Sequence, residues 1–260
     1  MPDWTASGRV KIERAKEHIS NLEAEIATFA KSDPYKVVPE IDKQTGEVVV
    51  CVRVKERPPL RWGTLAGDAV HNLRSALNIL WRTVWPVPVR DKSRKDSFPI
   101  FDSAKVFKTR FRGVKEPARQ AVMDILKALE PYKPGDEGGN ALLWKLGVVN
   151  DTDKHHLLIT IYVHFGEGVL TITPKGGEPE AFHMGMRGPA VPVEDGTVLL
   201  RVRKPTRGGV EMKMDVEVVF PVAFAEPEIV KGEAIIPTLH QLAGEVDGIV
   251  ETFARAGLLP

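Results

Sequence analysis

Cysteine is almost absent from this chain of 260 residues, and Cys51 alone cannot form an internal disulfide. The formal net charge is only +1, which excludes a global electrostatic field that would attract nucleic acid or an anionic membrane. No run approaches the roughly 18 apolar residues of a membrane-spanning helix. The start of the chain, Met1-Pro-Asp-Trp, lacks a basic segment followed by an apolar one, so no secretory signal is expected. These absences predict a cytoplasmic globular protein.

Several motifs of common catalytic and cofactor sites are also missing. There is no Gly-rich loop ending in Lys-Ser/Thr and no Gly-x-Ser-x-Gly turn, so neither a phosphate-binding loop nor a nucleophile elbow is expected. A metal site built from His71, His155, His156 and an acid is a weaker alternative, because no His-x-x-x-His or Cys-x-x-Cys spacing supports it. We therefore predict no cofactor and no metal.

What the sequence does contain is one strong helical pattern over residues 61–85. Apolar side chains recur on one side at helical spacing, and His, Ser, Asn and Arg side chains fall on the other. No Lys or Glu occurs from Trp62 to Val84, although those residues usually cover a solvated helix face. The polar side is therefore either a binding site or an internal hydrogen-bonded network, and the sequence leaves both interpretations open.

The remaining pattern predicts an α+β fold. It is a helical bundle of about five helices with a mainly antiparallel sheet inserted before the C-terminal helix. We expect one domain over 1–260, with a helical part at 5–155 plus 235–256 and a β-rich part at 156–225. The other helices are predicted at 5–31, 116–129, 140–153 and 238–254, and the strands at 35–41, 47–55, 157–165, 169–173, 181–186, 198–203 and 210–220. Gly166-Glu-Gly168 is expected to close a hairpin between the strands that flank it.

Residues 5–31 repeat apolar side chains at alternating spacings of three and four, a coiled-coil-like seam. Residues 238–254 show the same spacing and are the expected packing partner within the chain. The alternative use of this seam is a homodimer through the long helices.

Two polar stretches carry the candidate site residues. The tentative catalytic residues are His71, Arg74 and His155, and the tentative binding residues are Asp68, Asn72, Asn78, Asn150, Asp153 and Lys154. Histidine titrates near neutral pH, and a guanidinium can hold a phosphate with two parallel bonds. Each residue also has a structural interpretation, since buried Asn, His and Arg commonly bond to neighbouring backbone and side chains. We expect the two stretches to meet in space, with Arg74 pairing to Asp153 or Asp68 if its role is structural.

Four spaced motifs resemble a family of uncharacterised proteins from bacteria, chiefly actinobacteria, and their phages. They are Gly67-Asp-Ala-Val-His-Asn-Leu-Arg-Ser-Ala-Leu-Asn78, Phe98-Pro-Ile-Phe101, Glu130-Pro-Tyr132 and Asn150-x-x-Asp-Lys-His155. The family helix usually continues as Asp-His, where this chain has Asn78 and Ile79. In the usual form four residues separate the Arg from the His, a pattern similar to the signature of HEPN-type helical ribonucleases. Because Ile79 cannot transfer a proton, that activity would require His71 or His155 in its place.

Two functional hypotheses follow. The first is a non-catalytic binding or interaction protein whose polar residues lock the bundle. The alternative is a metal-independent, HEPN-like protein that cleaves RNA or binds a phosphate-bearing ligand through His71, Arg74 and residues 150–155. Solvent access to Arg74 separates the two, because a site needs an open pocket and a network needs its polar atoms paired.

Overall fold

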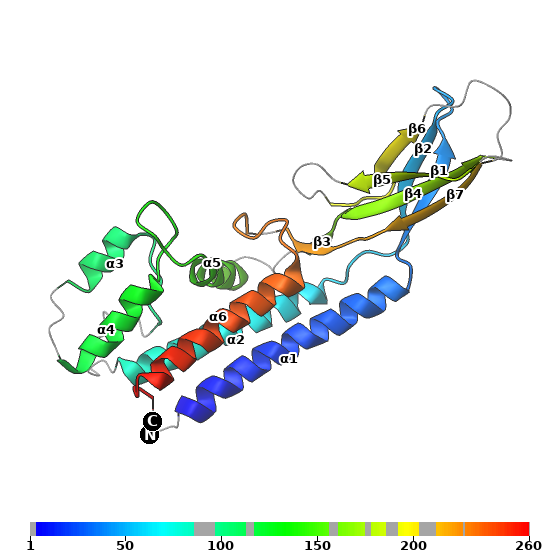
Figure 1. Cartoon of the computed structure of the whole chain (residues 1–260). Coiled ribbons are helices and arrows are strands. Elements are labelled where there is room, and N and C mark those ends of the chain that lie inside the picture. The colour runs from blue at the N-terminus through cyan, green and yellow to red at the C-terminus, as the bar shows by residue number, and fades with distance from the viewer. Residues whose placement is uncertain are drawn as a thin grey trace.

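The computed structural model describes residues 4–85, 97–112, 117–155, 161–174, 178–185, 192–202, 212–225 and 227–259. Within these residues the chain forms six helices and eight strands, which confirms the α+β prediction. The strands gather beyond one end of the long helices (Figure 1). No helix in the described ranges is long and apolar enough to cross a membrane.

Four helices build the main bundle: α1 (Trp4–Lys31), α2 (Arg61–Val84), α5 (Ala141–His155) and α6 (Ile235–Arg255). α1, α2 and α6 run side by side, and α5 packs on α2 and α6 (Figure 1). α1 does touch α6, as predicted, but its contact with α2 is much more extensive. The apolar side chains of α1 therefore pack mainly against α2 and to a smaller extent against α6.

The seam of α1 is buried inside the single chain. Ile12 is 2% exposed, and Ala15, Ile19 and Leu22 are fully buried. These four positions are therefore not free to contact a second copy. A homodimer through another surface of the long helices stays a prediction.

Two shorter helices, α3 (Ala104–Arg110) and α4 (Pro117–Leu129), lie at the end of the bundle away from the strands (Figure 1). An aromatic cluster includes Phe107 of α3. Sequence periodicity missed α3, which spans only two turns; Ser103 begins it by accepting a hydrogen bond from Val106 N at 3.3 Å. The cluster contains Trp81, Trp85, Phe98, Phe101, Phe107, Phe111 and Tyr132.

The hairpin of β1 (Tyr35–Ile41) and β2 (Val48–Val54) forms as predicted. Its loop begins at Asp42, which accepts from the main-chain N–H of Gln44, and ends at Gly46, whose φ of +73° favours glycine. β6 (Val198–Val202) joins β2 on its other edge. Residues before α2 therefore contribute strands to the β-rich region, beside those from 161 onward.

The pairing of the later strands differs from the prediction. β4 (Glu167–Pro174) lies between β5 (Glu180–Gly185) and β7 (Met212–Val218), while β3 (Ile161–Val163) pairs with β8 (Val222–Phe224). The expected hairpin around Gly166-Glu-Gly168 is wrong, because both edges of β4 are already occupied. Parts of the predicted strands, at 157–160, 186, 203 and 210–211, lie outside the described residues.

Candidate functional site

Arg74 and Asn78, one turn apart on α2, hold the same backbone segment. Arg74 Nη2 donates to the carbonyl oxygen of Phe98 at 2.8 Å, and Asn78 Oδ1 accepts from the amide N–H of Phe98 at 2.9 Å. Phe98 is fully buried, so its two main-chain polar groups need partners within the protein. The polar side of the central helix therefore fixes residues 97–101 against the bundle.

The guanidinium of Arg74 is largely buried, and this burial lowers its pKa from 12.5 to about 10. The nearby carboxylate of Asp151 partly offsets the shift. Nη1 is buried and has no hydrogen-bond partner among the described residues. The expectation that Arg74 would pair with Asp153 or Asp68 is wrong, since its bond goes to a neutral carbonyl.

The N-terminal half of the same helix has a different environment. Asn72 is buried, donates from Nδ2 to the carbonyl of Asp68 at 2.8 Å, and accepts from Lys11 Nζ at 3.3 Å. His71 is exposed, and its Nε2 lies 3.5 Å from the hydroxyl of Ser75. Asp68 is also exposed. Asn72 thus connects α1 to α2, while the imidazole of His71 faces away from the core.

The second polar stretch does approach the first. A β-carbon at Gly67 would stand 2.8 Å from Cγ of Asp153, so the missing side chain of Gly67 leaves room for the Asp153 carboxylate. Asn150 is 1% exposed; its Nδ2 donates to Asp151 Oδ1 at 3.3 Å, while its Oδ1 has no partner within the described ranges. The carboxylate of Asp153 on α5 therefore lies against α2 at Gly67, while the hydrogen bond from Asn150 Nδ2 stays within α5.

The two other sequence motifs also meet. Phe101 N donates to the carbonyl of Pro131 at 2.9 Å, and Lys133 N donates to the carbonyl of Phe101 at 2.9 Å. Glu130, with a φ of +49°, accepts from Gly139 N at 3.0 Å, which lowers the pKa of its carboxyl group. Phe98–Phe101 is therefore held by α2 on one side and by residues 130–133 on the other.

His155 ends α5, but its side chain, that of Lys154 and all of His156 lie outside the described residues. Whether they approach His71 or Arg74 stays a prediction. Among the described residues, no group of three His, Cys, Asp or Glu side chains could hold a metal ion.

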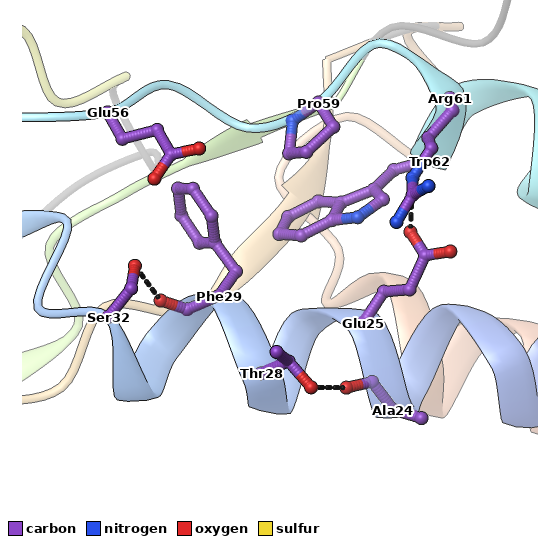
Figure 2. A pocket seen from close by; sticks show the side chains of 9 residues that line it. All are labelled: Ala24, Glu25, Thr28, Phe29, Ser32, Glu56, Pro59, Arg61 and Trp62. Atoms are coloured by element: carbon purple, nitrogen blue, oxygen red, sulfur yellow. Dashed lines mark hydrogen bonds and ion pairs between the residues drawn. The ribbon is translucent and has the colours of Figure 1, made fainter.

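A separate cavity of about 420 Å³ lies where the C-terminal half of α1 passes the start of α2 (Figure 2). α1 contributes Ala24, Glu25, Thr28, Phe29 and Ser32; the following segments contribute Glu56, Pro59, Arg61 and Trp62. We call this cavity the Phe29–Trp62 pocket. Its two rings meet edge to face, with centroids 5.1 Å apart. Its size falls within the range of small-molecule sites, roughly 300–1,000 Å³.

The charges around the Phe29–Trp62 pocket are unequal. Arg61 Nε lies 2.9 Å from Glu25 Oε2, so these two charges neutralise each other. Glu56 is exposed and has no ion-pair partner among the described residues. Trp62 is 1% exposed, and its indole Nε1 is buried without a hydrogen-bond partner in the described part of the chain.

Sequence reasoning missed this pocket. Trp62 is read as the first turn of the central helix and Phe29 as the end of the α1 seam, and nothing local connects two residues 33 positions apart. The only local signal is Pro58-Pro59, which fixes the entry into α2 and brings Pro59 beside Trp62 (Figure 2).

Comparison with protein-family models, curated proteins and solved structures gives no match for this chain. The family resemblance of the four motifs therefore stays a prediction.

Proposed function

We propose that this chain is a non-catalytic binding protein. In this proposal the polar residues of the central helix hold the bundle together, and the ligand binds elsewhere, in the Phe29–Trp62 pocket. The observation that supports the proposal most directly is that Arg74 and Asn78 both hydrogen-bond to the main chain of Phe98. Side chains committed to a buried main-chain segment are not available to a substrate.

The other motifs support the same proposal. Gly67 accommodates Asp153, and Phe101 exchanges main-chain bonds with residues 131 and 133. Each motif of the family resemblance thus has a structural partner in another motif. By contrast, the lining of the Phe29–Trp62 pocket includes exposed polar groups and a partly buried ring, which a ligand can reach without breaking the bundle.

The test is a thermal-shift screen of the purified chain against nucleotides, short RNAs and small organic ions, with Phe29→Ala as the pocket variant. We expect wild-type protein to be stabilised by one class of small ligand, and Phe29→Ala to lose that response. A matched control is Val106→Ala, which removes an exposed apolar side chain on α3 away from the pocket. Stabilisation that is equal in wild type and Phe29→Ala would refute the pocket as the binding site.

One observation favours a second candidate function. The contact of Gly67 with Asp153 brings the two polar stretches together, and both Arg74 Nη1 and Asn150 Oδ1 lack partners within the described ranges. A HEPN-like ribonuclease or phosphate-binding protein would use such groups together with His71. The ribonuclease alternative predicts that the chain cleaves single-stranded RNA without a metal ion and that His71→Ala loses this activity. Absence of cleavage in wild type, measured with a chelator present, would count against it.

A further inference from the structure

The chemistry of the Phe29–Trp62 pocket also indicates which ligand it would take. Figure 2 shows the Phe29 and Trp62 rings side by side, with the carboxylate of Glu56 directed toward the Phe29 ring and the Arg61–Glu25 pair at the other end. Pro59 completes an apolar wall above the rings. The pocket therefore combines aromatic surface with a carboxylate.

The electrostatic balance of the lining is negative. Arg61 is compensated by Glu25 at 2.9 Å, whereas the charge of Glu56 has no ion-pair partner among the described residues. Thr28 and Phe29 belong to the last turn of α1, and the C-terminal end of a helix carries a partial negative charge. Lys31 in the same turn and Lys55, whose Nζ donates to the carbonyl of Ser32 at 3.5 Å, offset part of that charge, so the carboxylate of Glu56 is the main negative group of the lining. Aromatic faces add a negative quadrupole that attracts cations. A cation is therefore favoured here over an anion.

The indole of Trp62 adds a second requirement. Trp62 is one of the residues that line the pocket, and its indole N–H is buried and lacks an acceptor in the described part of the chain. A buried donor without a partner is destabilising, so an oxygen acceptor delivered by a ligand would relieve that cost. The cation should thus carry a hydroxyl or carbonyl oxygen.

From these features we infer that the Phe29–Trp62 pocket binds a small alkylammonium ion that carries an oxygen acceptor. The ammonium group lies against the Phe29 ring and the Glu56 carboxylate, and the oxygen accepts from Trp62 Nε1. This inference rests on the proposed function, because it names the ligand class of the same pocket.

Three probes separate the two requirements. Choline carries both the cation and the oxygen, tetramethylammonium carries only the cation, and 3,3-dimethyl-1-butanol has the shape and oxygen of choline without its charge. Binding is followed by the indole N–H resonances of protein labelled at tryptophan with ¹⁵N, where Trp62→Phe identifies the Trp62 signal. If that variant fails to fold, the Trp62 signal is identified instead as the indole resonance that responds to saturation transfer from a bound probe.

We expect choline to bind most tightly and to shift the Trp62 indole resonance in a saturable way. Tetramethylammonium should bind more weakly and leave that resonance nearly unmoved, and the neutral alcohol should bind at least about tenfold more weakly than choline. Glu56→Gln should weaken choline binding about tenfold, as expected for one partly screened charge contact. Glu178→Gln, which neutralises an exposed carboxylate outside the pocket, should leave it unchanged.

The outcomes distinguish this inference from the proposed function. If the neutral alcohol binds as tightly as choline, or Glu56→Gln has no effect, the cation assignment is overturned while the pocket remains a ligand site. If the indole shift is the same with tetramethylammonium, the role of the oxygen acceptor is overturned. If none of the three probes binds while the thermal-shift screen finds a ligand lost in Phe29→Ala, the ligand class is wrong and the function stands. If neither experiment detects binding, both proposals fail.

Discussion

Replacing Asn78 by alanine tests directly whether its hydrogen bond to the main chain of Phe98 stabilises the fold. The change removes the Oδ1 atom that accepts from Phe98 N at 2.9 Å, and Phe98 is fully buried. A buried N–H left without an acceptor costs about 1–3 kcal/mol. We therefore expect Asn78→Ala to lower the free energy of unfolding by roughly that amount.

Arg74→Met should be milder, although it removes the neighbouring bond. The lost hydrogen bond from a charged donor is worth roughly 1.5–3 kcal/mol. Against this stands the cost of burying the guanidinium. The pKa of Arg74 falls from 12.5 to about 10, which corresponds to roughly 3 kcal/mol against the charged form. The methionine side chain keeps most of the apolar packing, so the two contributions nearly cancel and the net change should stay within about 1 kcal/mol.

The assay is urea unfolding of both single variants and of the double variant. Because Arg74 and Asn78 bond to one peptide, the two changes should be non-additive by about 0.5–3 kcal/mol. Ser75→Ala is the matched control on the same helix, and its effect should stay within about 0.5 kcal/mol. If Asn78→Ala is as stable as Ser75→Ala, or if the effects of the two single variants on the free energy of unfolding add up in the double variant, the two residues do not hold Phe98 together. A role for Arg74 in binding a substrate would then be possible again.

Three further predictions concern packing and pH. Leu22 is fully buried, so Leu22→Ala should lower the free energy of unfolding in urea by roughly 2–5 kcal/mol, whereas a Glu23→Ala control on the exposed face should stay within about 0.5 kcal/mol. Gly67→Ala should stabilise the chain by up to about 1 kcal/mol in an Asp153→Ala background, but by less in wild type, where the Asp153 carboxylate must move aside to make room for the added methyl group; an equal gain in both backgrounds would exclude the contact. Burial raises the pKa of Tyr35 from 10.0 to about 12, so the unfolded chain ionises first and stability falls between these pH values. In Tyr35→Phe the free energy of unfolding should therefore fall less steeply above pH 10, by roughly 1.4 kcal/mol per pH unit, as measured by unfolding at several pH values. The same slope in wild type and Tyr35→Phe would contradict the burial of the Tyr35 hydroxyl.

Local patterns in the sequence determined most of the secondary structure. The spacing of apolar residues located α1, α2, α4, α5 and α6, because a helix buries one face and its period is fixed by geometry. The β1–β2 hairpin followed in the same way, since its loop combines Asp42 with a glycine at positive φ. The unusual composition of the central helix also marked Arg74 and Asn78 as residues with polar partners.

Tertiary structure alone decided what those partners are. The bond from Arg74 to the Phe98 carbonyl crosses 24 residues, and the pairing of β2 with β6 crosses about 150, so neither leaves a periodic trace in the sequence. The same holds for the Phe29–Trp62 pocket, which exists only because two helix ends pack beside a proline-fixed segment. Periodicity reports which face of an element is buried, but the identity of the group on the other side depends on how the elements are arranged in space.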